Sequence, residues 1–140
     1  MHQFLWTILL INGLWVNAVF PQTQHSPSGT PGQKSTARIQ YGIASYYADK
    51  FNGRSTANGE IFSQKKMTAA SNTLALNIWV RVTNLANKKS AVVRITDRMY
   101  QRNRRLIDLS KAAARALDYT ARGITKVKVE VLGKKRPVPK

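Results

Sequence analysis

Three of the six carboxylates in this 140-residue chain stand where one predicted element gives way to the next. Glu60 lies in a loop of small polar residues, Asp97 ends an apolar run, and Asp108 lies just before a predicted helix. Fixed scaffolds often present functional side chains at such junctions. A compact fold could place Asp97 and Asp108 beside one groove, and paired carboxyl groups are usual in enzymes that cleave glycosidic bonds. Aromatic rings that could stack on sugars belong to Tyr46, Tyr47 and Tyr100.

Each of these carboxylates also has a purely structural explanation. The charge of Asp108 would stabilise the positive end of the helix that follows it, and Glu60 could close a turn that contains glycine. Asp97 is followed by several arginines, so an ordinary ion pair would account for it. Tyr46 and Tyr47 point to opposite faces of a predicted strand, so at most one of them faces a groove. The residues alone leave catalytic and structural roles open.

The composition narrows the possible chemistry. The chain has no cysteine, which excludes thiol nucleophiles, cysteine zinc sites and disulfides, and its two histidines are His2 and His25, far upstream. We therefore expect neither a metal ion nor a cofactor, and acid–base catalysis falls to the carboxylates. Lys and Arg number 23 against 6 Asp and Glu, a formal net charge of +17. Such a surface is suited to anionic partners.

The composition also changes along the chain and predicts four segments. An uncharged apolar run from Phe4 to Val16, followed by Asn17-Ala18, is typical of a secretory signal peptide over residues 1–18. Residues 19–38 are predicted to be a disordered linker, residues 39–132 the folded domain, and residues 133–140 a basic tail. Without a cysteine to lipidate, we expect an exported, unanchored monomer in the periplasm or cell envelope.

Alternation of apolar and polar residues predicts the elements that position the candidates. Three segments show the period of two that is typical of strands, namely 78–82, 91–96 and 126–131. The first two are expected to form a hairpin in which Asn87 takes a positive φ. A helix over about 110–118 is expected, with Ser110 as its N-cap. Its buried face is expected to comprise Ala113, Ala116 and Leu117. The fold class is therefore mainly β, a small closed barrel with a short capping helix.

Six short motifs are spread over about residues 41–132, nearly the whole domain. They are Gly42-Ile-Ala-Ser-Tyr-Tyr47, Phe51-Asn-Gly-Arg-Ser-Thr-Ala-Asn-Gly-Glu60, Met67-Thr-Ala-Ala70, Val80-Arg-Val-Thr-Asn-Leu85, Val93-Arg-Ile-Thr-Asp-Arg98 and Leu106-Ile-Asp-Leu-Ser-Lys-Ala-Ala113. Their order and spacing resemble the RlpA (rare lipoprotein A) family. The resemblance implies a six-stranded double-psi β-barrel, related to expansins. It also implies a lyase, an endolytic peptidoglycan transglycosylase that cleaves peptide-free glycan strands to 1,6-anhydromuramyl products in cell-wall remodelling or daughter-cell separation.

The resemblance further implies roles for individual residues. The acidic pair of the family falls on Glu60 and Asp97, and Asp108 matches the aspartate of an expansin-like Asp-Leu-Ser motif. We predict that Asp97 protonates the glycosidic oxygen and then takes the proton of the muramyl 6-hydroxyl, with Glu60 as the second groove carboxylate. Asp108 would position strand and helix, or act as the donor instead. The predicted substrate-binding residues are Tyr47, Thr56, Asn58, Ser71, Arg98 and Tyr100.

The chain departs from the family pattern at several positions. Ser71 stands where the family typically has histidine, Ser63 where an acidic residue is common, and Met99-Tyr100 where Gly-Pro is usual. These departures leave open a non-catalytic, expansin-like module that binds glycan without cleaving it. A third hypothesis is a polyanion binder driven by charge alone. For an exported chain the available anions are envelope polymers, so we expect no nucleic-acid partner.

Overall fold

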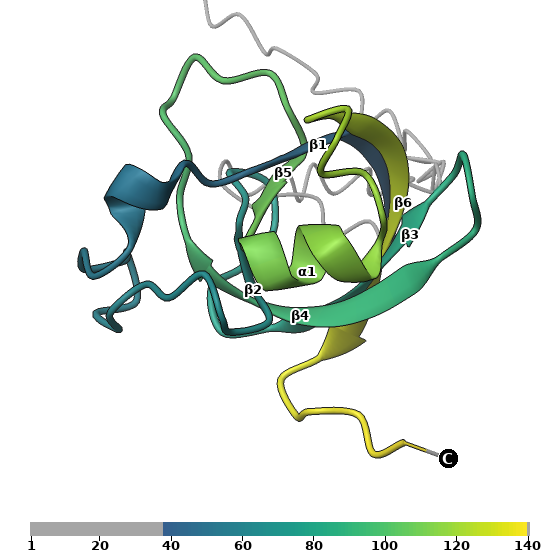
Figure 1. Ribbon diagram of the computed structural model, residues 1–140. Helices are drawn as coiled ribbons and strands as arrows, with labels where there is room; N and C mark the ends of the chain where they lie inside the picture. Colours follow the sequence, from purple (N-terminus) through teal and green to yellow (C-terminus); the bar gives the residue numbers. More distant parts are fainter. Residues whose placement is uncertain (1–37, 140) are drawn as a thin grey trace, which may run out of the picture. The chain divides into compact units, whose positions relative to one another are not determined.

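The computed structural model describes residues 38–139. The predicted signal peptide and residues 19–37 of the predicted linker lie outside the described residues. The described part contains six strands, one α-helix and one 3₁₀ helix (Figure 1). In chain order these are β1 (Ile39–Tyr46), the 3₁₀ helix η1 (Asp49–Phe51), β2 (Thr68–Ala70), β3 (Trp79–Asn84), β4 (Ser90–Asp97), β5 (Ile107–Leu109), α1 (Lys111–Ala116) and β6 (Thr125–Gly133).

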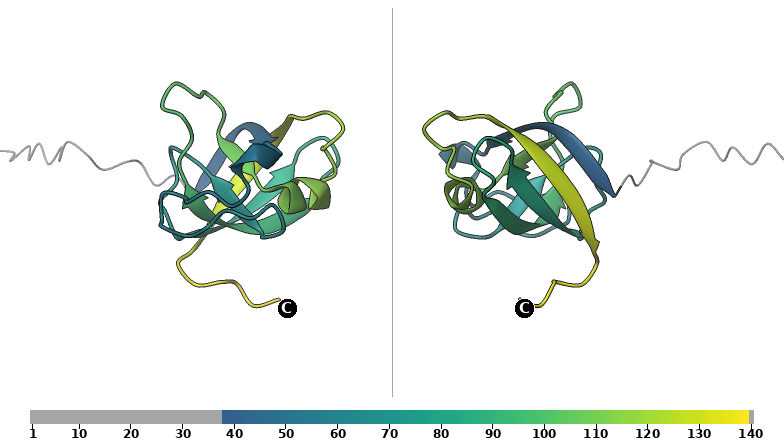
Figure 2. Two further views of the ribbon diagram at one scale, coloured as in Figure 1. Left: turned by 60° about the vertical axis from the view of Figure 1, so that its left-hand side comes forward. Right: turned by 90° about the vertical axis from the view of Figure 1, so that its right-hand side faces the viewer.

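The six strands close into a barrel in the order β1-β5-β2-β4-β3-β6. β1 runs parallel to β5, and β2 runs parallel to β4, whereas the other paired neighbours are antiparallel. Figure 2 shows β1 and β6 side by side along one wall. Closure gives each strand a neighbour on both sides, which protects strand edges from pairing with other chains. The prediction of a mainly β, six-stranded barrel with one short helix is confirmed.

Alternate residues of the long strands fill the barrel interior. The fully buried positions include Val80 and Val82 of β3, Val93 and Ile95 of β4, and Val127 and Val129 of β6. These residues occupy the inward positions of the period-two pattern, because successive side chains of a strand point to opposite faces. β6 continues to Gly133, which pairs with Trp79, so regular structure extends one residue into the predicted basic tail.

Gly42 of β1 allows the start of β5 to approach closely. The Leu106 N–H donates to the Ile43 carbonyl oxygen at 2.9 Å. A Cβ atom at position 42 would lie 2.6 Å from the Cβ of Leu106, closer than two such atoms can pack. A side chain at this position would therefore push away the segment that leads into β5, the strand that carries Asp108.

The helix α1 packs against β1, β4 and β5. Its N-cap is Ser110, as predicted, because the Ser110 side chain accepts a hydrogen bond from the Ala113 N–H. Ala113 and Leu117 are buried as expected, but the prediction that Ala116 belongs to the buried face is wrong. The helix ends at Ala116, and Ala114 is buried in its place. No helix within residues 38–139 has the length and apolar character needed to cross a membrane.

The predicted hairpin joins β3 and β4, which pair antiparallel from Trp79–Arg94 to Thr83–Ser90. The prediction that Asn87 takes a positive φ is wrong, because that conformation belongs to Lys88, with a φ of 65°. The Asn87 amide instead donates to the Leu117 carbonyl oxygen at 3.0 Å and accepts from the Lys89 N–H at 3.0 Å. The side chain thus ties the hairpin to the end of α1.

Candidate active site

Two of the candidate carboxylates lie in register across three neighbouring strands. Ala70 of β2 pairs with Asp97 of β4 on one side and with Asp108 of β5 on the other. Adjacent strands lie about 4.8 Å apart, so the two aspartates are separated by roughly 10 Å between their Cα atoms. The residue between them carries only a methyl group, which leaves the space between the two carboxyl groups open.

A β-bulge places Asp97 in register with Ala70 and Asp108, so that the three residues form a row across β4, β2 and β5. Ala69 pairs with Ile95, but Ala70 pairs with Asp97, so Thr96 is an extra residue on β4. In a regular pairing, Thr96 would stand opposite Ala70. Bulges redirect side chains in this way and are frequent beside active sites. The bulge therefore places a carboxylate where the uninterrupted strand would place a hydroxyl.

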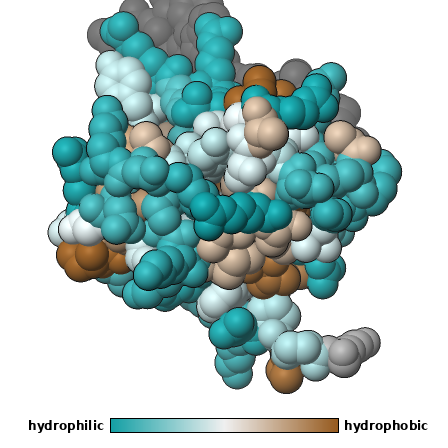
Figure 3. Space-filling model, in the orientation of Figure 1, coloured by the Kyte–Doolittle hydropathy of each residue, from teal (hydrophilic) through white to brown (hydrophobic). Residues whose placement is uncertain are grey.

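The row faces a groove with a volume of about 510 Å³. One wall is the end of β1 with η1, and the other is the connection from β4 to β5 (Figure 1). The space-filling view of the same face is largely hydrophilic, with apolar areas that are small and separate (Figure 3). The groove is lined by Tyr46, Tyr47, Ala48, Lys50, Phe51, Ala70, Asp97, Arg98, Met99, Tyr100, Asn103, Arg105 and Asp108.

Asp97 is held by three hydrogen-bond donors. The Tyr47 hydroxyl donates to Oδ2 at 2.8 Å, and the N–H groups of Ala57 and Arg98 donate to Oδ1 at 2.9 and 2.8 Å. Within residues 38–139 it is the one carboxylate with no Lys or Arg nitrogen within 4.0 Å. The prediction of an ordinary ion pair at Asp97 is therefore wrong. The Arg98 guanidinium donates instead to the carbonyl oxygens of Ser71 and Leu74.

The side chains of Tyr46 and Tyr47 have different surroundings, as their alternation along the strand predicts, but both border the groove. The Tyr47 ring stacks on Phe62 at 4.1 Å between centroids and meets Phe51 edge-on at 5.8 Å. Burial and the hydrogen bond to Asp97 raise the pKa of the Tyr47 hydroxyl, which therefore stays protonated and acts as a donor. Tyr46 packs against the core and against Tyr119, yet it also borders the groove.

Asp108 is bound by an arginine that the sequence interpretation did not assign to it. Nε and Nη2 of Arg105 donate to the two carboxylate oxygens of Asp108 at 2.8 and 3.0 Å, and the Asp108 side chain is 16% exposed. The hydrogen bond to Asp108 also raises the pKa of the Arg105 guanidinium. The structural role of Asp108 is thus the anchoring of the β4–β5 connection beside the groove.

Glu60 does not line the groove, in contrast to its prediction as the second groove carboxylate. Both of its oxygens accept from Nη2 of Arg94 at 2.6 Å. In the same loop, the Thr56 hydroxyl binds the Asn58 side chain at 2.6 Å and the Glu60 carbonyl oxygen at 2.9 Å. Thr56 and Asn58, predicted to bind substrate, thus bind each other and shape the loop that presents the Ala57 N–H to Asp97.

The family follows from comparison with known proteins. Residues 39–129 match the family model described as lytic transglycolase. The chain belongs to this family. It is 46% identical over 101 residues to the endolytic peptidoglycan transglycosylase RlpA of Haemophilus influenzae, a match that covers 72% of this chain and 35% of that protein. To the RlpA of Pasteurella multocida it is 50% identical over 91 residues, with coverage of 65% and 31%.

The chain thus spans about a third of the length of these curated relatives. The apo structure of an expansin from Clavibacter michiganensis shares the fold with a TM-score of 0.55 and 22% identity, covering 72% of this chain and 52% of that one. The predicted RlpA family and double-psi β-barrel are confirmed.

Two of the departures from the pattern of the lytic transglycolase family can now be located. Ser71 is fully buried, and its hydroxyl donates to the Leu106 carbonyl oxygen at 2.9 Å, so it cannot reach a sugar in the groove as predicted. Met99 and Tyr100 line the groove, and Tyr100 is 74% exposed there. Tyr47, Arg98 and Tyr100 are therefore the predicted substrate-binding residues that the structure brings to the groove.

Several groove residues were not predicted from the sequence. They are Ala48, Lys50, Phe51, Ala70, Met99, Asn103 and Arg105. Phe51 and Ala70 stand within motifs that carry the family resemblance, which is the one signal that could have identified them. Within residues 38–139, no three His, Cys, Asp or Glu side chains gather closely enough to hold a metal ion.

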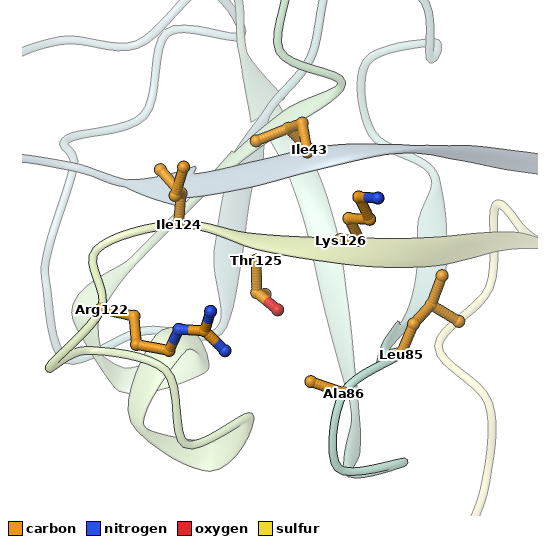
Figure 4. Close-up of a pocket in the computed structure, with 7 residues that line it drawn as sticks. All are labelled: Ile43, Leu85, Ala86, Arg122, Ile124, Thr125 and Lys126. Carbon is orange, nitrogen blue, oxygen red and sulfur yellow. The ribbon is translucent and has the colours of Figure 1, made fainter.

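A second hollow, of about 410 Å³, lies elsewhere on the barrel (Figure 4). Figure 4 shows it between the start of β6, Ile43 of β1 and the residues after β3, with the Arg122 side chain reaching in from the left. It is lined by Ile43, Leu85, Ala86, Arg122, Ile124, Thr125 and Lys126. This set includes no carboxylate, whereas the groove described above contains Asp97 and Asp108.

The ion pair of Glu60 predicts a pH-dependent effect on stability. The hydrogen bond from Arg94 lowers the pKa of Glu60 below its ordinary value of 4.5, so the pair stabilises the fold above that pH and its contribution is lost as the pH falls through the lowered pKa. Because the Glu60 side chain is 41% exposed, we expect Glu60→Gln to lower the free energy of unfolding at pH 7 by no more than about 1 kcal/mol.

Denaturant unfolding at pH 7 and pH 3 would measure this difference, which should shrink at the lower pH. Asp118→Asn is the matched control, because Asp118 makes a single contact of 3.2 Å with Lys89 and its side chain is 70% exposed. An effect of Glu60→Gln that is equally large at both pH values would show that the ion pair is not its cause.

Proposed function

We propose that this chain is an exported endolytic transglycosylase that cleaves peptide-free glycan strands of peptidoglycan and leaves 1,6-anhydromuramyl ends. The observation that carries the proposal is the setting of Asp97, which lines the groove and has no cationic partner within residues 38–139. Protonation of Glu60 or Asp108 would break a bidentate ion pair, whereas protonation of Asp97 breaks none. The names of the relatives describe the same activity in those proteins.

In the proposed reaction, Asp97 acts first as an acid and then as a base. Its carboxyl group gives a proton to the glycosidic oxygen, and the bond between that oxygen and C1 of the muramyl residue breaks. The muramyl 6-hydroxyl oxygen then bonds to C1, and its proton passes to the Asp97 carboxylate. No water is consumed, so the product is an anhydro ring and Asp97 returns to its starting state.

The neighbouring residues support this cycle without exchanging protons. The Tyr47 hydroxyl and two backbone N–H groups fix the orientation of the Asp97 carboxyl group. Asp108 lies across Ala70, where its ion pair with Arg105 holds the β4–β5 connection that forms one wall of the groove. Glu60 and Arg94 are positioning residues, because they hold the loop that carries the Ala57 N–H.

Product analysis tests the proposal. Residues 19–140, which include the whole barrel, would be incubated with amidase-treated glycan strands, and the soluble products analysed by mass spectrometry. Fragments with anhydromuramyl ends would support a transglycosylase, and fragments with reducing muramyl ends would indicate hydrolysis instead. If the chain sediments with the glycan but releases no fragments, the non-catalytic glycan-binding function is the correct one.

We further propose that the charge of the chain keeps it near anionic polymers of the cell envelope, where it acts as an unlipidated monomer. The chain has 23 Lys and Arg against 6 Asp and Glu, and the ion pairs within residues 38–139 engage only five of these cations. Most Lys and Arg side chains in that part of the chain therefore have no carboxylate partner. Attraction between exposed charges is screened by salt. Retention on isolated sacculi should therefore fall steeply between low and high salt, and retention that is insensitive to salt would contradict this role.

A further inference from the structure

The groove contains a lysine whose charge no contact in residues 38–139 neutralises. Three cations line the groove, namely Lys50, Arg98 and Arg105. Arg98 donates to the carbonyl oxygens of Ser71 and Leu74, and Arg105 binds Asp108. Lys50 makes no ion pair within the described residues, and its ammonium nitrogen lies 5.3 Å from the centre of the Phe51 ring. Among the residues that the structure describes, the groove thus carries one cation, Lys50, that no carboxylate neutralises and that can bind a ligand.

The position of Lys50 is fixed by its neighbours in η1. The adjacent carboxylate, Asp49, is turned toward α1, where Lys111 donates to its two oxygens at 2.6 and 2.8 Å. This hydrogen bond lowers the pKa of Asp49. The Gln64 side chain donates to the Tyr47 carbonyl oxygen at 2.8 Å and accepts from the Lys111 N–H at 2.7 Å. η1 is therefore anchored to α1, while Lys50 remains exposed beside the groove.

We propose that Lys50 is a specificity-determining residue that binds the free lactyl carboxylate of a muramyl residue. This inference rests on the proposed function and identifies how the groove would distinguish its substrate. Removal of a stem peptide converts the amide on the lactyl group into a carboxylate, so a peptide-free strand carries one negative charge per disaccharide. An attached peptide leaves that position neutral and bulky.

The groove wall offers contacts both for the sugar rings of a peptide-free strand and for its lactyl carboxylate. The exposed Tyr100 ring on the opposite wall offers a flat apolar surface to a sugar ring, and the Phe51 ring, with the Lys50 ammonium over it at 5.3 Å, borders the same groove. The Lys50 ammonium offers a point charge to the lactyl group. An exposed ion pair of this kind contributes a factor of about two to five in affinity, and this contribution weakens as salt rises.

A binding experiment with paired ligands tests the proposal. The ligands are peptide-free glycan fragments with free lactyl carboxylates and the same fragments with these groups converted to methylamides. The protein is residues 19–140 with Asp97→Asn, which blocks cleavage. At low salt we expect the carboxylate form to bind about two to five times more tightly than the amide form. Lys50→Gln should abolish this ratio and leave the Kd of the amide form unchanged, whereas Lys50→Arg should retain the ratio.

The matched control is Lys135→Gln, which removes the same charge from an exposed position in the tail, away from η1. Equal ratios in the Lys50→Gln and Lys135→Gln variants would overturn the proposal, because the preference would then reflect overall charge. Equal binding of both ligand forms by the Asp97→Asn chain would also overturn it while leaving the glycan site in place. Failure to bind either form would overturn the proposed function together with this inference.

Discussion

Asp97→Asn is expected to lower the rate at which anhydromuramyl fragments appear by about 100-fold or more, the usual contribution of a general acid–base residue. An asparagine at this position retains the size of the side chain and can still accept from the Ala57 and Arg98 N–H groups, which bind Oδ1. It cannot deliver a proton to a glycosidic oxygen. The initial rate of fragment release from peptide-free strands, measured by mass spectrometry, gives the result directly.

Glu60→Gln is the control for this experiment. Glu60 pairs with Arg94 and does not line the groove, so its substitution should act only through the loop that carries Ala57. An exposed ion pair is worth a factor of about five at most, and the loss of activity should be no larger. If Asp97→Asn retains activity and Asp108→Asn loses it, the proton donor is Asp108. If Glu60→Gln has the largest effect, the groove described above is not the site of proton transfer.

The long strands and the helix of the barrel could be predicted from the sequence because their side chains alternate between core and solvent. Val80, Val82, Val127 and Val129 show this period and are buried as expected. The three-residue strands β2 and β5 are too short to show any period. The position of Ala70 between Asp97 and Asp108 depends on those two strands, and only the family resemblance covered that part of the chain.

The sequence predicted two of the groove carboxylates but not the contacts that hold them. Asp97 and Asp108 stand at element junctions, and the structure brings both to one groove as expected. The β-bulge at Thr96 could not be predicted from the sequence pattern. The pairing of Glu60 with Arg94, 34 residues away in the chain, could not be predicted either. Long-range pairing decided which carboxylates remained without a cation, and local sequence carries no information about such pairing.

The absence of an arginine contact at Asp97 has a geometric origin within residues 38–139. The guanidinium of the next residue, Arg98, binds the carbonyl oxygens of Ser71 and Leu74 instead. Arg105 is occupied by Asp108. The connection from β4 to β5 is rich in arginine, yet these two arginines of the groove serve the scaffold. Asp97 thus has no cationic partner in the part of the chain that the structure describes, despite a net charge of +17.

Tyr47→Phe is expected to lower the rate of fragment release by about 10- to 100-fold, because a hydrogen bond to a charged group is typically worth about 1.5–3 kcal/mol. The substitution removes the hydroxyl that donates to Oδ2 of Asp97 at 2.8 Å and leaves the ring between Phe51 and Phe62. Without this donor, Oδ2 is free to turn away from the glycosidic oxygen. The raised pKa of Tyr47 excludes a role for its hydroxyl as a base near neutral pH, so the effect would be one of orientation.

Tyr46→Phe is the matched control, since it removes a hydroxyl from the adjacent residue without touching Asp97. The Tyr46 hydroxyl donates to the Thr120 carbonyl oxygen at 3.0 Å, so this substitution should lower the unfolding temperature and leave the rate of fragment release nearly unchanged. A rate that falls equally in both variants would mean that the tyrosines act through stability alone. A rate that falls only in Tyr47→Phe, with thermal unfolding preserved, would show that the activity depends on how the Asp97 carboxyl group is held.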